Sequence, residues 1–224
     1  MSEKIKYFFY NLISFPNYIL FHPFDGFDDF KTGKKGKMWV AILMMALFAL
    51  LNIITFQYEG FIINNRNPLD LNNIQIIFTV ALILGLFVVG NWSVTTLMSG
   101  KGNFKEIFLV TGYSLFPIVI IGFPAVFLSN YLTLEESSFY TLIMGLAYFL
   151  TGWMLFMGIL NIHEFGLFKT LWCFLCTAVS MMVMVFFGLL FFDLIQQFIG
   201  FIAAIIEELG LRRWNGLNII IKNY

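Results

Sequence analysis

Charged residues are scarce in this chain, and their scarcity excludes most soluble folds. Asp, Glu, Lys and Arg make up 12% of the 224 residues, whereas hydrophobic residues make up 60%. Soluble domains carry about 25% charged and about 45–50% apolar residues. A chain with so little charge cannot cover its own surface in water, so we expect much of that surface to face a lipid bilayer.

The net charge and the number of cysteines exclude two further classes of protein. The formal net charge is zero, so a nucleic-acid partner has no electrostatic support and is not expected. The chain has only two cysteines, which cannot form a disulfide framework.

Five long stretches contain no Asp, Glu, Lys or Arg. A helix rises about 1.5 Å per residue, so about 20 apolar residues cross a hydrocarbon core of about 30 Å. Barrel strands alternate apolar and polar residues, and these stretches do not. The sequence therefore predicts an all-α, polytopic integral membrane protein with five transmembrane helices, at residues 38–57, 74–98, 107–129, 138–162 and 170–192.

A shorter charge-free stretch, Tyr7–Phe24, lies within the N-terminal segment of residues 1–37. Pro16 interrupts it and no cleavage site of small residues follows, so it is predicted to be neither a span nor a signal peptide. Two interpretations remain open. Either it packs against the helix bundle, or it forms an interfacial helix whose apolar residues lie in lipid, namely Phe8, Phe9, Leu12, Ile13 and Phe15.

Lysine and arginine are unevenly divided between the two ends of the spans. The end that carries the N-terminal segment and the second and fourth loops holds nine of the 13. Cytoplasmic loops are enriched in Lys and Arg close to the membrane, so the N-terminus is expected in the cytoplasm. With five spans the C-terminus is then outside, and "SGKGNFKE" (residues 99–106) forms a cytoplasmic turn.

The last span continues beyond the length that a membrane requires, because "DLIQQFIGFIAAIIEELG" follows it without a proline. We expect one helix from about Leu171 to about Leu209 that projects on the outer side, or a bend near Asp193 into an interfacial helix. Residues 38–206 then form the five-helix domain, and residues 210–224 a C-terminal tail. Three polar residues beyond the span are candidates for docking a partner: Asp193, Gln197 and Arg212.

Residues that often carry catalysis are present without a catalytic arrangement. Cys173 and Cys176 form a C-x-x-C pair, but their apolar surroundings favour two core thiols over a redox site. "HEFGL", which begins at His163, lacks the second histidine of a zincin helix. A zinc site formed by His163, Glu164 and the two cysteines would require the loop between the fourth and fifth spans to fold back. The sequence therefore predicts no enzymatic activity, no cofactor and no metal site.

Small and polar residues inside the spans admit two interpretations. A polar strip in the second span predicts hydrogen bonds between helices, with a substrate path as the alternative; its residues are Asn91, Ser93 and Thr95. Pro117 and Pro124 share a face of the third span, where they kink the helix. Gly145, Gly152 and Ile159 recur at intervals of seven and predict a packing face on the fourth span.

Several stretches occur in the order seen in a known family. "GYSLFPIVII" (112–121) resembles the Gly-Tyr-x-Leu-x-Pro core of Yip1/Yif1 domain proteins. "HPFDGFDDFK" (22–31) and "NWSVTTLMSGKGNFKEIF" (91–108) resemble segments of bacterial members, and "HEFGLFKT" and "LIQQFIGFI" also fit. The chain thus resembles a bacterial-type member of the Yip1 family over most of Phe21–Ile206.

This resemblance implies a five-helix membrane domain with a cytosolic N-terminus, in which Tyr113 and Pro117 are fold determinants. Eukaryotic members bind Rab GTPases and carry a long cytosolic region with an Asp-Leu-x-Gly-Pro motif. Here only 37 residues precede the first span and the motif is missing. We therefore do not expect a Rab partner, and we expect a prokaryotic plasma (cell) membrane protein.

These observations favour a non-enzymatic scaffold or accessory subunit of a membrane complex, such as a transporter complex. Its partner would be another membrane protein or an extracytoplasmic protein. The alternative is a small-solute channel or transporter in its own right, whose path would use the polar strip and the two prolines.

Overall fold

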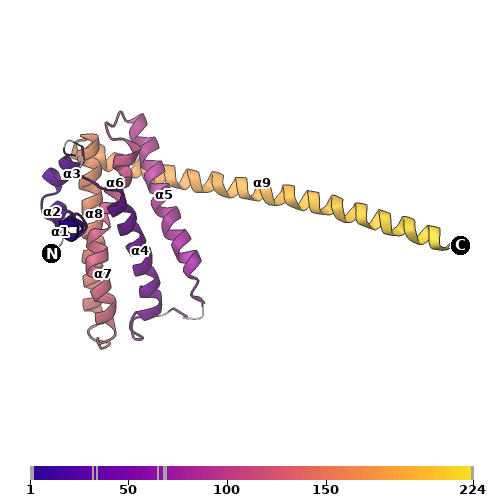
Figure 1. The fold of residues 1–224 in the computed structure, drawn as a ribbon, viewed down its shortest axis with the longest axis horizontal. Coiled ribbons are helices and arrows are strands. Elements are labelled where there is room, and N and C mark those ends of the chain that lie inside the picture. The colour runs from indigo at the N-terminus through magenta and orange to yellow at the C-terminus, as the bar shows by residue number, and fades with distance from the viewer. Residues whose placement is uncertain (1–2, 32, 34, 65, 68–69, 223–224) are drawn as a thin grey trace. The chain divides into compact units, whose positions relative to one another are not determined.

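The computed structural model describes residues 3–31, 33, 35–64, 66–67 and 70–222. Within these ranges the regular elements are all helices, and five of them are long and apolar enough to cross a membrane (Figure 1). The prediction of an all-α polytopic membrane protein is confirmed.

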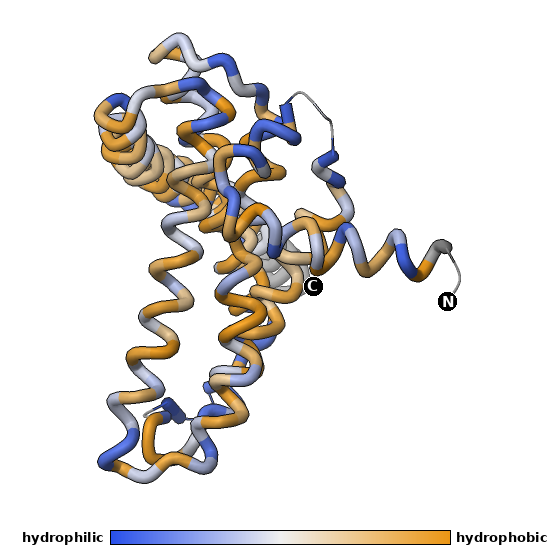
Figure 2. Tube along the Cα trace, turned by 90° about the vertical axis from the view of Figure 1, so that its left-hand side faces the viewer, coloured by the Kyte–Doolittle hydropathy of each residue, from blue (hydrophilic) through white to orange (hydrophobic). Residues whose placement is uncertain are grey.

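The helices that correspond to the first, second and fourth predicted spans begin and end within a few residues of the expected positions. They are α4 (Met38–Tyr58), α5 (Asn73–Leu97) and α8 (Ser137–His163). Apolar residues predominate along the long helices of the bundle, and hydrophilic residues are concentrated in the loops that connect them (Figure 2). The length of a hydrocarbon crossing fixes these boundaries.

The third span is divided into two helices, α6 (Phe104–Ser114) and α7 (Phe116–Ser129). Pro117 lies in the first turn of α7, where it cannot donate a backbone hydrogen bond and its ring crowds the carbonyl four residues earlier. The chain at Leu115 therefore leaves the regular helix. This divided helix is central to the first unit, because 72% of its most apolar stretch is buried, against 17% of that of α5.

The N-terminal segment folds into four short helices, and its second half packs against the bundle. The helices are α1 (Glu3–Phe9), the π-helix η1 (Tyr10–Ser14), α2 (Phe15–Phe21) and α3 (Pro23–Lys31). Phe15, Phe27 and Phe30 are buried in the main core. The placement of Phe15 and Leu12 in lipid is therefore wrong, since both contact this core, whereas Phe8, Phe9 and Ile13 remain exposed.

The last helix, α9 (Leu167–Lys222), crosses the boundary between two compact units, Met1–Ser180 and Met181–Tyr224. It continues past the predicted end near Leu209 and ends at Lys222. The prediction of a separate C-terminal tail that begins at residue 210 is therefore wrong, because residues 210–222 belong to this helix. It also has no break at Asp193, which contradicts the alternative of a bend there.

The glycine pattern of the fourth span does not mark a packing face. A Cβ atom at Gly145 or Gly152 would meet nothing within 4 Å, whereas one at Gly158 would lie 2.5 Å from Val110 Cγ1. A seven-residue spacing drifts by about 20° per repeat in a straight helix. Gly145 therefore lies about 40° away from the buried Ile159, and it faces outward.

Candidate functional site

Tyr113 joins three parts of the chain. Its side chain is fully buried, and its hydroxyl accepts a hydrogen bond of 3.0 Å from the backbone N–H of Lys37, the residue before α4. The rings of Phe15 and Phe30 meet it edge-on, with centroids 6.0 and 4.9 Å away. Tyr113 therefore holds α6 against the N-terminal segment and the start of α4.

Gly112, the residue before Tyr113, sets the distance between α4 and α6. A Cβ atom at Gly112 would lie 2.5 Å from Ala41 Cβ and 2.6 Å from Ala41 Cα. Only glycine allows α4 and α6 to approach this closely. Together with the buried Pro117, which begins α7, these residues give a physical account of the Gly-Tyr-x-Leu-x-Pro pattern.

The predicted polar strip does not act as one unit. Asn91 is fully buried, and its Nδ2 donates to Thr177 Oγ1 of α9 at 3.1 Å and to Cys173 Sγ at 3.6 Å. The Thr95 hydroxyl donates to the Asn91 carbonyl at 2.7 Å. Ser93 is instead partly exposed and donates to the carbonyl of Val89 in its own helix. Asn91 thus ties α5 to the start of α9, as an interhelix hydrogen bond does in lipid.

The other candidate residues are dispersed. Cys173 is buried and Cys176 is exposed. Among the described residues, no three His, Cys, Asp or Glu side chains gather in a way that could hold a metal ion. On α9, Gln197 Nε2 donates to Asp193 Oδ2 at 2.8 Å, so these two docking candidates share a face. The side chain of Arg212 lies outside the described residues.

The structure brings together a charged cluster that the sequence interpretation did not assemble. The Glu164 carboxylate accepts hydrogen bonds from the Lys31 and Lys101 ammonium groups. Lys31 ends α3, Lys101 lies in the α5–α6 loop, and Glu164 follows α8 in a left-handed conformation with φ of 54°. We call this set, with His163, the charged junction. It links three segments that are far apart in the sequence.

His163 provides the apolar side of the charged junction. It is buried and stacked on Phe165, and its Nδ1 accepts a hydrogen bond of 3.2 Å from the backbone N–H of Gly102. A Cβ atom at Gly100 would collide with the His163 ring, and one at Gly102 with the Ile162 side chain. The glycines on both sides of Lys101 therefore let this loop lie against the end of α8.

One signal in the sequence could have found this junction. The C-terminus of a helix carries partial negative charge, so an acidic residue there is unfavourable unless a cation compensates it. Glu164 directly follows α8, and its pKa is lowered to about 2 by the hydrogen bonds from Lys101 and Lys31. An acid at the end of a span thus predicts a basic residue beside it.

We expect the charged junction to depend on pH through Glu164. Because the folded-state pKa is lowered, the carboxylate stabilises the junction fully above about pH 4.5, and this contribution is lost as the pH falls towards 2. Glu164→Gln removes the charge of this side chain, so the variant should lack the stabilisation of the junction already at pH 7. Backbone amides of residues 28–31 and 99–103 should exchange hydrogen about two- to fivefold faster, the effect typical of an exposed ion pair.

Hydrogen–deuterium exchange in detergent micelles, corrected for the intrinsic rate at each pH, measures this effect. Glu135→Gln in the α7–α8 loop is the matched control and should leave these amides unchanged. Equal exchange at pH 7 in Glu164→Gln and in the parent protein would contradict the role of Glu164.

A known family matches the part of the chain that contains these residues. A model of the Yip1 domain matches residues 17–190, which include α3, Tyr113, Pro117 and the charged junction. No curated protein and no solved structure matches the chain significantly. The match covers more than half of the chain, and the chain therefore belongs to the Yip1 domain family.

Proposed function

We propose that this Yip1-family membrane protein is a non-enzymatic scaffold or accessory subunit of a membrane complex. We further propose that it is a bacterial-type member in a prokaryotic plasma membrane, with its N-terminus in the cytoplasm and its C-terminus outside. The length and composition of α9 carry the proposal of a scaffold, and the uneven division of Lys and Arg between the two ends of the spans supports the orientation.

α9 is much longer than a membrane crossing. Its 56 residues correspond to about 84 Å of helix, almost three times a hydrocarbon core of about 30 Å. The charge-free stretch Thr170–Phe192 already suffices for the crossing. The part of α9 that follows Phe192 is therefore not needed to cross the hydrocarbon core of the bilayer.

The excess part of the helix is still apolar. Phe198, Ile199, Phe201 and Ile202 have exposed side chains, and the second unit consists of a single helix that cannot bury them within itself. Apolar surface in water costs about 25 cal/mol per Å². Large exposed apolar patches mark interaction sites, so we infer that a partner protein covers this part of α9. The Asp193–Gln197 pair supplies a polar edge beside this surface.

The alternative of a solute transporter receives less support. Pro117 is buried whereas Pro124 is exposed, so the two prolines do not both line a path inside the bundle. Asn91 is used in packing α5 against α9. These roles are structural, and they leave the scaffold as the preferred function.

A photo-cross-linking experiment tests the proposal. Phe201 is replaced by a photoreactive phenylalanine analogue, and Phe149 of α8, which is exposed at a comparable 67%, serves as the matched control. We expect irradiation of cells to join Phe201 to one protein of defined size and Phe149 to lipid only. The same partner should copurify at fixed stoichiometry in mild detergent. A protein that purifies alone and gives no protein adduct at Phe201 would refute the proposal.

A further inference from the structure

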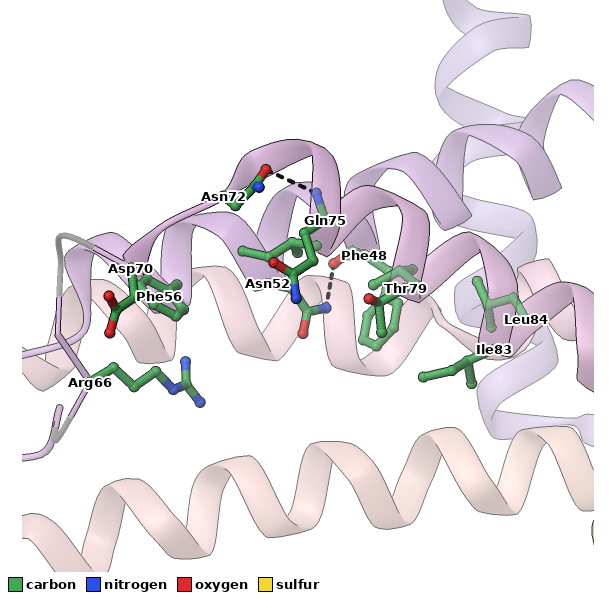
Figure 3. Close-up of a pocket in the computed structure, with 12 residues that line it drawn as sticks. Phe48, Asn52, Phe56, Arg66, Asp70, Asn72, Gln75, Thr79, Ile83 and Leu84 are labelled. Carbon is green, nitrogen blue, oxygen red and sulfur yellow. Dashed lines mark hydrogen bonds between the residues drawn. The ribbon is translucent and has the colours of Figure 1, made fainter. Parts of the chain in front are cut away.

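A cavity of about 450 Å³ lies between α4 and α5, at the end where residues 59–72 connect them (Figure 3). Its two ends differ in chemistry. Arg66, Asp70 and Gln75 line one end, whereas Ile83 and Leu84 line the other. The volume is within the range of about 300–1,000 Å³ found for small-molecule sites.

A second cavity of about 330 Å³ continues the first along the same two helices. Val80 and Leu84 line both, so the two cavities form one groove, which we call the α4–α5 groove. The second part is apolar and ends near Val88. From Gln75 to Val88 the groove extends about 20 Å along α5, which is comparable to the hydrocarbon depth of one leaflet, about 15 Å.

The groove is open to the side. Ile42, Ile77 and Ile83 line its edges and have exposed side chains, and α5 as a whole is little buried. A Cβ atom at Gly85, in the wall of the groove, would meet nothing within 4 Å. A hydrocarbon chain in the bilayer can therefore enter the groove laterally.

The polar end carries one charge of each sign. The Arg66 guanidinium lies 5.6 Å from the centroid of the Phe56 ring, a cation–π contact that leaves its N–H groups available. Among the residues that the structure describes, neither Arg66 nor Asp70 forms an ion pair with another side chain. Guanidinium binds phosphate in a fork geometry, and a carboxylate accepts hydrogen bonds from a primary ammonium group.

We propose that the α4–α5 groove binds a phospholipid whose headgroup carries both a phosphate and a primary amine. The phosphate lies at Arg66, the ammonium group at Asp70, and one acyl chain follows the apolar wall past Gly85. A charged end beside an apolar wall matches a headgroup and its acyl chain, and this combination favours a lipid over an apolar helix of a partner protein.

Lipid retention measured by native mass spectrometry tests this proposal. The full chain is purified from nanodiscs that contain equal amounts of phosphatidylethanolamine, phosphatidylcholine and phosphatidylglycerol. We expect one retained phosphatidylethanolamine per chain, because phosphatidylcholine has no N–H to donate to Asp70 and phosphatidylglycerol has no cation. Arg66→Gln should lower the retention about tenfold, the effect of losing a charge-assisted hydrogen bond.

Gly85→Leu fills the groove and should abolish retention. Gly145→Leu is its matched control, because a Cβ atom there also meets nothing within 4 Å, and it should retain the lipid. Equal retention in the parent and in Gly85→Leu would overturn the groove as the lipid site. Loss in Gly85→Leu without any headgroup preference would overturn the roles of Arg66 and Asp70. Should Gly85→Leu fail to fold, unchanged retention in Arg66→Gln would by itself overturn the headgroup assignment.

Discussion

Replacement of Tyr113 by alanine is expected to lower the free energy of unfolding by about 3–5 kcal/mol, the range measured for large aromatic residues in cores. The side chain is fully buried between Phe15 and Phe30, so its removal leaves a cavity where α6, α4 and the N-terminal segment meet. Titration with sodium dodecyl sulfate in mixed micelles, followed by circular dichroism, measures the change.

Two variants separate the ring of Tyr113 from its hydroxyl. Tyr113→Phe keeps the packing and removes only the acceptor for the Lys37 N–H, so we expect a loss of about 1 kcal/mol. Tyr131→Ala removes a tyrosine that is 85% exposed and should change the stability by less than about 0.5 kcal/mol. If Tyr113→Ala resembles Tyr131→Ala, Tyr113 does not hold the three segments together.

Gly112→Val is expected to destabilise the protein by about 3 kcal/mol or more, at the upper end of the costs of overpacking. The new side chain would meet the Cα and Cβ atoms of Ala41, and backbone cannot rotate away as a long side chain can. The helices α4 and α6 would have to separate, and the contact of Tyr113 with the start of α4 would be lost. The same titration in mixed micelles gives the magnitude.

Gly145→Val is the matched control for this substitution. It places the same side chain in the middle of another spanning helix, at a position where a Cβ atom meets nothing within 4 Å. We expect its stability to lie within about 0.5 kcal/mol of the parent. Equal losses in the two variants would show that valine is harmful in any of these helices, and that the approach of α4 to α6 is not the cause.

The contrast between these two glycines shows the limit of sequence interpretation in this protein. Both lie in apolar helices, and the spacing of Gly145, Gly152 and Ile159 pointed to the wrong face. In a soluble protein the buried face of a helix is the apolar one, which the sequence reveals. In a bilayer the lipid is as apolar as the protein core, so hydrophobicity does not distinguish the buried face from the exposed one.

The charged junction shows a second limit. The sequence presents His163 and Glu164 as residues that could bind a metal, and Lys101 as a marker of the cytoplasmic side. Their assembly depends on α8 ending beside the α5–α6 loop and on α3 packing against α8, which are contacts between distant parts of the chain. The unfavourable position of Glu164 at a helix end was the only local sign of it.

The sequence by itself determined that the chain forms five membrane-spanning helices, where the first four begin and end, and that Pro117 interrupts the third. These features follow from the cost of unsatisfied backbone groups in hydrocarbon and from the missing N–H of proline, both of which act locally. Only the tertiary structure decided that Gly112 lies against α4, that Asn91 bonds to α9, that Phe15 enters the core, and that Lys31 and Lys101 meet at Glu164. Close packing and ion pairing between helices depend on how their surfaces meet, and apolar helices in an apolar solvent do not carry that information in their composition.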